Sequence, residues 1–244
     1  MNHMQLVLVA APLIGRDANL VSSWGANIDA VAVAHPEFHF IKCMAIREKD
    51  NIARQSCEDA KIEILTVPWY SILTDKRHNY DGVMAKRTRL MQEAVAQHVD
   101  IIWYVDADII VQPRHWNAIA SLLIQKYPVV VIPYAIRWAD GNPSVCVNSS
   151  SSSLELSLHD SRSFSSTDED QCDSKQIAGG GFGCTALIVN IAADIPFNIQ
   201  ELALSSGGYV RGEDIGWFLN AHSAGIKVQM PLGITVDHIG CKEN

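Results

Sequence analysis

Short apolar runs and longer segments with helical spacing alternate along the first half of the chain. The apolar runs have the length and β-branched content of buried strands, and they are Gln5 to Ala11, Phe38 to Ile46, Lys61 to Val67 and Ile101 to Val105. The segments between them predict helices, namely Asp17 to Ala34 with Asp17 as a possible cap, the stretch after Asp50 to Ala60, and Tyr80 to His98. This alternation of strand and helix predicts a parallel sheet with right-handed crossovers.

The second half continues this pattern but contains one long interruption. A helix is predicted from Pro113 to about Gln125 and another from Gly212 to about Ala224, with strands at Pro128 to Tyr134, Cys184 to Asn190 and, as the last one, Lys227 to Leu232. From Ala139 to Gln176, five consecutive serines and an acidic cluster replace the apolar periodicity. Such a composition buries little surface, so we expect a long loop that is mobile without ligand. Both a lid over a neighbouring site and an insertion without a role remain open.

Length and composition are ordinary for a globular enzyme with either one large α/β domain or two small ones. The 244 residues are 48% hydrophobic and 19% charged, with a formal net charge of −8. The negative charge, with no basic run to offset it, argues against a nucleic-acid partner. Six scattered cysteines without a C-x-x-C pair indicate thiols in a reducing compartment. No apolar run approaches the roughly 20 residues of a membrane span, and Gln5 to Ile14 lacks a basic leader, so a cytoplasmic location is expected.

Two carboxylates interrupt the apolar stretch that starts at Ile101. Asp106 and Asp108 stand one residue apart, between Val105 and a second apolar run. Burying a carboxylate without a cationic partner costs about 3–5 kcal/mol. Two carboxylates at the end of a buried strand therefore need a compensating positive charge. A divalent cation at the carboxyl end of the strand is the usual form that this compensation takes.

The helix predicted from Tyr80 to His98 carries a cation on its apolar face. That face is formed by Val83, Met84, Leu90, Met91, Ala94 and Val95. Arg87 lies in the middle of this face, and its position beside the carboxyl ends of the strands predicts that it approaches Asp106 and Asp108. With Lys86 beside it, Arg87 could bind a pyrophosphate. A purely structural ion pair with an acidic neighbour is the alternative.

Three short motifs resemble those of nucleotide-sugar-dependent glycosyltransferases with the GT-A fold, and they occur in the same order. Asp106-Ala107-Asp108 is similar to the D-x-D motif, Gly212-Glu213-Asp214 to the x-E-D motif, and His238 to the C-terminal metal-binding histidine. The resemblance implies a single GT-A-like α/β domain over residues 1–244, with a mostly parallel central sheet and helices on both faces. Residues up to about 111 would bind the nucleotide, and residues from about 112 to 244 would bind the acceptor.

The resemblance also implies a donor site. Mn²⁺ or Mg²⁺ would bridge Asp108, His238 and the pyrophosphate of a nucleotide-diphosphate sugar, with a UDP-sugar expected. Asp106 would orient the ribose or reach the metal through water. The remaining donor contacts would come from Lys86, Arg87, Ala107 and, around the nucleotide base, Ala11, Pro12 and Leu13. For the last three residues a simple tight turn is the alternative.

On the acceptor side, the resemblance implies roles for the glycine turn and the last long helix. Gly180 and Gly181 would line the donor sugar and the acceptor, although a simple bulge would also use glycines. Asp214 would be the general base of an inverting transfer, while Glu213 would contact substrate hydroxyls. Trp217, one turn from Asp214, would form a sugar platform. The alternative is that the acidic residues only favour the helix dipole.

The expected activity is therefore transfer of a hexosyl or pentosyl group to a carbohydrate hydroxyl. Three other functions stay open. A phosphatase of the haloacid-dehalogenase type also carries Asp-x-Asp after a strand, but near its N-terminus. A sugar nucleotidyltransferase shares the architecture but has a glycine-rich, arginine-containing loop that Leu13-Ile14-Gly15-Arg16 matches poorly. A non-catalytic sugar-binding module is the third.

Overall fold

The computed structural model of the chain describes residues 4–68, 80–134, 145–148, 156–158, 174–203 and 209–239. The helices in these residues are the 3-10 helix η1 (Gly15–Leu20) and the α-helices α1 (Val21–Ala34), α2 (Asn51–Asp59), α3 (Tyr80–Ala96), α4 (Pro113–Ile124), α5 (Val189–Ala192) and α6 (Glu213–Ser223). The strands are β1 (Gln5–Pro12), β2 (Phe38–Arg47), β3 (Glu63–Val67), β4 (Ile101–Val105), β5 (Ile109–Ile110), β6 (Val129–Val131), β7 (Val145–Asn148), β8 (Leu156–Leu158), β9 (Ser174–Ile177), β10 (Gly179–Gly180), β11 (Cys184–Ile188), β12 (Gln200–Ala203), β13 (Tyr209–Gly212), β14 (Val228–Pro231) and β15 (Asp237–His238).

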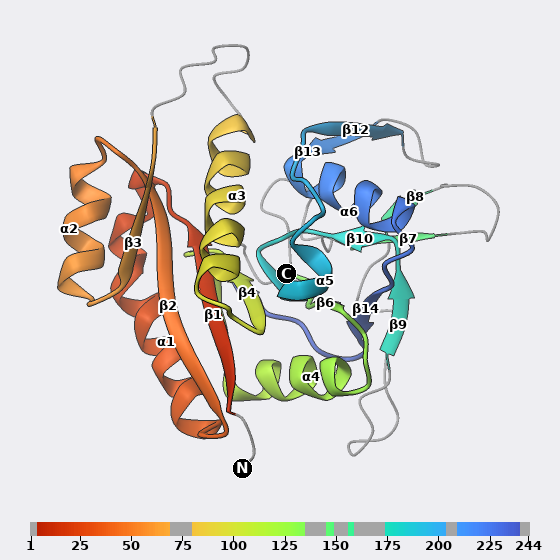
Figure 1. Ribbon diagram of the computed structural model, residues 1–244, viewed down its shortest axis with the longest axis horizontal. Helices are drawn as coiled ribbons and strands as arrows, with labels where there is room; N and C mark the ends of the chain where they lie inside the picture. The colour runs from red at the N-terminus through yellow and green to blue at the C-terminus, as the bar shows by residue number, and fades with distance from the viewer. Residues whose placement is uncertain are drawn as a thin grey trace.

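A central sheet runs through the molecule (Figure 1), with its described strands in the order β3-β2-β1-β4-β11-β6-β14-β9. β3, β2, β1 and β4 are parallel neighbours, as are β6 and β14. β11 is antiparallel to both β4 and β6, and β9 is antiparallel to β14. β4 and β6 therefore run in the same direction, so their carboxyl ends meet at one edge. The expected mostly parallel α/β fold is confirmed.

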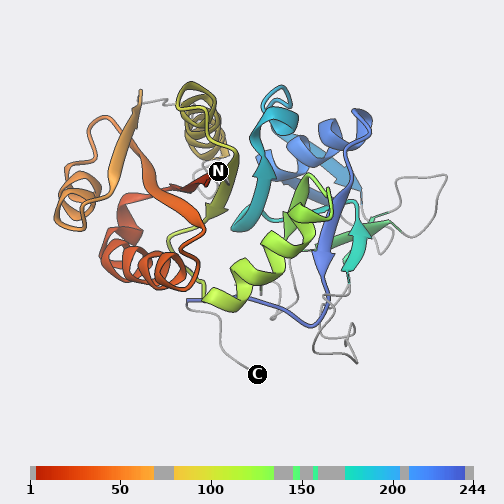
Figure 2. The same cartoon turned by 60° about the horizontal axis from the view of Figure 1, so that its bottom comes forward.

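Alternate residues of the central strands face two hydrophobic cores. Val7 and Val9 of β1 pack in one core with residues of α1, α2 and α4. Leu8 and Ala10 pack in the other core with residues of α3, α5 and α6. Figure 2 shows these two groups of helices on opposite sides of the sheet. Burial on both faces explains why the strands are continuous apolar runs rather than alternating ones.

Two local expectations change in the structure. Asp17 lies in the first turn of η1 and caps no helix, since α1 begins after Leu20. The loop expected from Ala139 to Gln176 is wrong where β7, β8 and β9 lie, and the rest of that range is outside the described residues. β9 is polar but pairs with β14 at the edge of the central sheet, where one face and one side can remain solvated. None of the described helices combines the length and the apolar character that crossing a bilayer requires.

Candidate functional site

The turn Asp106-Ala107-Asp108 follows the fully buried β4 at the carboxyl edge of the sheet. The backbone N–H of Asp106 donates to the carbonyl of Gly183 at 2.9 Å, and the N–H of Ile109 donates to the carbonyl of Asp106 at 3.0 Å. These bonds tie the turn to the glycine segment that precedes β11. Ala107 is 8% exposed and packs in the core, so only the two carboxylates of the turn are available for chemistry.

His238 lies beside Asp108, although the two residues are far apart in the sequence. β15 pairs antiparallel with β5 and places His238 opposite Ile109. The N–H of Ile239 also donates to the carbonyl of Asp108 at 2.8 Å. As a result, Nε2 of His238 lies 3.1 Å from Oδ2 of Asp108. The short ribbon of β5 and β15 thus joins a carboxylate from the first half of the chain to an imidazole from its last residues.

The Asp108–His238 pair fits a divalent cation with an incomplete protein ligand set. Across the described ranges, no three His, Cys, Asp or Glu side chains gather into a metal-binding group. Mg²⁺ commonly uses only one or two carboxylates and takes its other ligands from substrate phosphates and water. Carboxylate oxygen suits both Mn²⁺ and Mg²⁺, whereas imidazole nitrogen is a ligand of first-row transition metals, so the pair fits Mn²⁺ better than Mg²⁺. Asp108 and His238 are therefore the residues that could hold such an ion together with a diphosphate.

Asp106 faces Arg87 of α3, as its position on the apolar face of the helix predicts. Nη2 of Arg87 lies 3.3 Å from Oδ1 of Asp106, and Nη1 lies 3.4 Å from Oε1 of Glu213. The guanidinium is stacked 5.0 Å from the ring centroid of Phe182 and is 4% exposed as a residue. The structural ion pair weighed from the sequence is thus present. Within the described residues, the buried Nε and Nη1 of Arg87 have no hydrogen-bond acceptor, although Nη1 keeps its ionic contact with Glu213.

Burial controls the protonation of the three carboxyls around Arg87. Desolvation raises the pKa of Asp106 and of Asp214, and it raises the pKa of Glu213 to about 7. The positive charge of Arg87 opposes the increase in all three cases. The cluster is consequently an acid–base group whose charge state depends on one buried cation.

Asp214 is the second residue of α6 and is half-buried. One of its carboxylate oxygens accepts a hydrogen bond from the N–H of Ile215 at 2.8 Å. Glu213, its neighbour, is 6% exposed and paired with Arg87, so the substrate contact expected for it is not supported. Asp214 is the member of this pair that remains partly accessible.

Trp217 is not the sugar platform that the sequence suggested. Its side chain is 0% exposed and packs against the aromatic rings of Phe182, Phe197 and Phe218 at centroid distances of 5.2, 6.2 and 5.3 Å. The one-turn spacing from Asp214 is correct, but this face of α6 meets the core. Burial of such an aromatic group stabilises the fold and leaves no ring face for a sugar.

The glycine turn accommodates neighbouring side chains of the protein. A Cβ on Gly181 would stand 2.1 Å from the Tyr134 hydroxyl, one on Gly183 would stand 2.7 Å from its ring, and one on Gly179 would stand 2.5 Å from Phe218. Gly180 and Gly181 are themselves buried. The turn therefore holds Tyr134, a residue that we did not identify from the sequence. Its signal was slight: a single hydroxyl-bearing aromatic residue at the end of a predicted strand.

The end of β1 is packed into the protein. The side chains of Ala11, Pro12 and Leu13 are buried, and the first residue to reach the surface is Ile14, which is 36% exposed. The Leu13 N–H donates to the carbonyl of Ala45 at 3.0 Å, and Nζ of Lys86 donates to the carbonyl of Leu13. Burial lowers the pKa of Lys86 to about 8. Lys86 thus supports this strand end directly, and its expected contact with phosphate stays a prediction.

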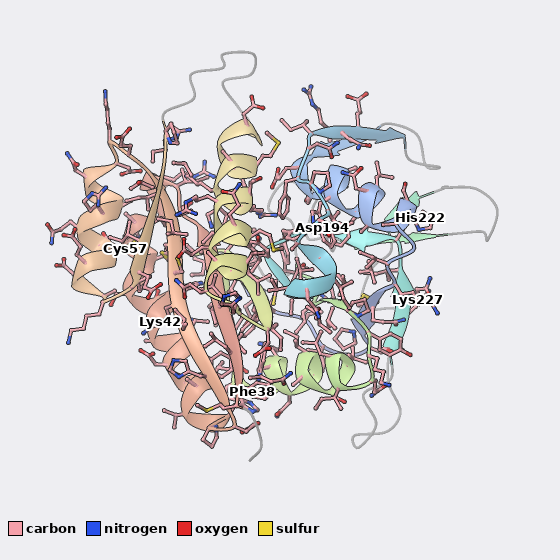
Figure 3. The ribbon with its side chains drawn as sticks, in the orientation of Figure 1. Phe38, Lys42, Cys57, Asp194, His222 and Lys227 are labelled. Atoms are coloured by element: carbon pink, nitrogen blue, oxygen red, sulfur yellow. The ribbon has the colours of Figure 1, made fainter. Side chains whose placement is uncertain are left out.

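A separate cavity of about 570 Å³ lies at the opposite edge of the sheet. It is lined by the first residues of β1, β2 and β4, which are Gln5, Phe38 and Ile101, and by one side of α4. Figure 3 labels Phe38 there, at the start of β2 close to α4. Its walls are mainly apolar and contain neither the two carboxylates after β4 nor Arg87, Asp214 or His238, so this cavity is not the candidate site.

No protein-family model matches the chain. The chain is 25% identical over 234 residues to an uncharacterized protein of African swine fever virus (isolate Tick/Malawi/Lil 20-1/1983), covering 92% of this chain and 95% of that protein. The counterpart of that protein in isolate Tick/South Africa/Pretoriuskop Pr4/1996 is 26% identical over 244 residues, with coverage of 96% and 98%. These relatives match nearly the whole chain.

Solved structures give a likeness of fold. An inositol-1-phosphate CTP transferase from T. maritima superposes with a TM-score of 0.51 at 9% identity, covering 97% of this chain and 89% of that one. A CMP:2-keto-3-deoxy-manno-octonic acid synthetase complexed with CTP gives a TM-score of 0.50 at 12% identity, with coverage of 96% and 90%. With the sheet order above, these likenesses show a GT-A-like α/β fold.

Proposed function

We propose that this chain is a metal-dependent glycosyltransferase that moves a sugar from a nucleotide-diphosphate sugar, with UDP as the expected nucleotide, to a carbohydrate hydroxyl with inversion. The observation that carries the proposal is the 3.1 Å contact between Asp108 and His238 at the carboxyl edge of the sheet. A carboxylate and an imidazole at that edge form a place for a cation and a diphosphate. The second half of the chain supplies the partly accessible carboxylate of Asp214 to the same cluster.

On the donor side, Asp108 and His238 would hold Mn²⁺ or Mg²⁺. When bound, this ion supplies positive charge against the nucleotide diphosphate as it leaves. Asp106, held by Arg87, would orient the ribose, and Arg87, whose Nε has no acceptor among the described residues, would donate to a phosphate oxygen. The nucleotide base would lie beyond the end of β1, near Ala11 to Leu13.

On the acceptor side, Asp214 would take the proton of the attacking hydroxyl. Direct displacement at an anomeric carbon needs a base on the side opposite the leaving group. Burial raises the pKa of Asp214, which makes its carboxylate a stronger base than an exposed aspartate. The N–H of Ile215 fixes one of its oxygens and leaves the other for the acceptor.

A sugar nucleotidyltransferase is the second candidate, because the two solved structures reported above are a CTP transferase and a synthetase complexed with CTP. The local geometry favours the first candidate. β1 ends at Pro12 and η1 begins at Gly15, so only Leu13 and Ile14 connect them. A connection this short offers few backbone N–H groups to cradle a triphosphate.

One assay separates the two candidates. The purified chain is incubated with Mn²⁺ and either UDP-sugars plus sugar acceptors, or CTP plus sugar phosphates and sugar acids. We expect release of nucleoside diphosphate that increases when acceptor is added and is lost in Asp214→Asn. The control is Asp194→Asn, an exposed aspartate after α5 (Figure 3) whose substitution should leave the rate unchanged. Release of pyrophosphate from CTP would instead establish nucleotidyl transfer and overturn the proposal.

A further inference from the structure

Tyr134 lies where the two halves of the candidate site meet. It follows β6, whose carboxyl end is at the same edge as that of β4, and it forms a parallel bridge with Val236. Its ring is 5.5 Å from the imidazole of His238, with the two ring planes at 84°. The phenol is thus in edge-to-face contact with one half of the Asp108–His238 pair.

The hydroxyl of Tyr134 is held by an incoming hydrogen bond. The N–H of Gly183 donates to it at 3.2 Å. A phenolic hydroxyl accepts with its lone pairs and donates with its single proton. In the part of the chain that the structure describes, no acceptor takes that proton. The hydroxyl therefore has one donor function left, and its position is fixed by Gly181 and Gly183, where a Cβ would collide with Tyr134.

The surrounding charges define what Tyr134 can bind. Asp106, Asp214 and Arg87 all lie close enough to Tyr134 for their charges to act on it. A phenol with its ordinary pKa of about 10 is protonated at neutral pH, so the hydroxyl is a hydrogen-bond donor. The two neighbouring carboxylates repel an anionic group at this position, whereas an uncharged oxygen can accept this proton without that repulsion. A sugar hydroxyl has the further advantage that it can itself donate to a carboxylate.

We propose that the Tyr134 hydroxyl donates a hydrogen bond to a hydroxyl of the transferred sugar. The inference rests on the proposed function, because an in-line displacement places that sugar between the leaving diphosphate and the base. Tyr134 contacts His238 on the diphosphate side and is close enough to Asp214 to be influenced by its charge. Tyr134 is therefore a sugar-binding residue, and the glycine turn contributes to sugar binding by making room for it.

The test compares Tyr134→Phe with the wild type on UDP-glucose, UDP-galactose or UDP-N-acetylglucosamine, whichever is turned over best, and on its monodeoxy analogues. With the parent donor we expect kcat/KM to fall about tenfold, the effect of one lost hydrogen bond to an uncharged group. With the one analogue that lacks the contacted hydroxyl, wild type and variant should be nearly equal. Calorimetry should show the same pattern in the Kd of the donor and no change in the Kd of UDP. An equal loss on every donor would overturn the assignment.

Two further variants exclude a purely structural explanation. Tyr104→Phe removes a buried hydroxyl that donates to the carbonyl of Arg87 at 3.0 Å, so it should reduce stability without changing the ratio between parent and deoxy donors. Gly181→Ala displaces Tyr134 and should reproduce the pattern of Tyr134→Phe. If the wild type uses CTP and a sugar phosphate instead of a UDP-sugar, the proposed function fails. Comparing the wild type and Tyr134→Phe on sugar phosphates and their deoxy analogues then tests the role of Tyr134 independently of the proposed function.

Discussion

Arg87 of α3 and Glu213 of α6 form a buried ion pair, 3.4 Å between Nη1 and Oε1, which connects the two halves of the chain across the candidate site. The same guanidinium contacts Asp106 at 3.3 Å. Arg87 therefore holds the end of β4 and the first turn of α6 together. Because these are the elements that carry Asp106 and Asp214, the geometry of the site depends on this one cation.

Replacing Arg87 by methionine should strongly destabilise the protein. The change leaves Asp106 and Glu213 buried without their cation, which typically costs about 3–5 kcal/mol. The matched control on the same helix is Arg89→Met, which removes an i,i+4 ion pair with Glu93. The side chain of Arg89 is 38% exposed. That pair should contribute only about 0.3–0.5 kcal/mol. Urea unfolding of both variants measures the difference, and similar losses would show that the Arg87 cluster is not a stabilising centre.

Removing either member of the Asp108–His238 pair should weaken metal-dependent nucleotide binding. We expect Asp108→Asn and His238→Ala to raise the Kd of UDP in the presence of Mn²⁺ on the order of 10–100-fold. Binding of UDP without metal should change little. His222→Ala, at an exposed histidine of α6 (Figure 3), is the control and should bind as the wild type does. Calorimetric titration of each variant with UDP, with and without Mn²⁺, tests this prediction. If both variants bind UDP with wild-type affinity in the presence of Mn²⁺, Asp108 and His238 are not part of the donor site.

Glu213 predicts a pH dependence of stability. Its pKa is about 7 in the folded protein against an ordinary 4.5. Between these values the native state holds a proton that the unfolded state has released, so stability falls as pH rises through this window. Glu213→Gln stays neutral and should lose less stability across it, by up to about 1.4 kcal/mol per pH unit for one proton. Urea unfolding at a series of pH values tests this, and parallel curves for the two proteins would contradict it.

The sequence was sufficient to predict those parts of the structure that a local pattern of residues determines. Burial on both faces makes a central strand a continuous apolar run, so β1 and β4 were recognisable. The position of Arg87 on the apolar face of its helix predicted its contact with Asp106, which is confirmed at 3.3 Å. In both cases the signal lies within a few neighbouring residues.

Where contacts between distant segments determine the structure, it could not be predicted from the sequence. The spacing of Trp217 and Asp214 gives a shared helix face but does not reveal that this face meets Phe182 and Phe197 in the core. β9 is polar and gains its stability from pairing with β14, which composition does not show. Gly181 and Gly183 leave room for a close approach, which the sequence analysis assigned to the sugar and the acceptor. The approaching group, however, is Tyr134, contributed by a different strand end.

The central claim, inverting glycosyl transfer with Asp214 as base, is tested most directly by proton NMR of the anomeric signal during turnover by the wild type and Asp214→Asn. We predict a product with the anomeric configuration opposite to that of the donor. We also predict that Asp214→Asn keeps nearly the wild-type affinity for donor and loses about 10²–10⁴-fold in rate. A product with retained configuration, or near-normal turnover by Asp214→Asn, would contradict the mechanism proposed for this site.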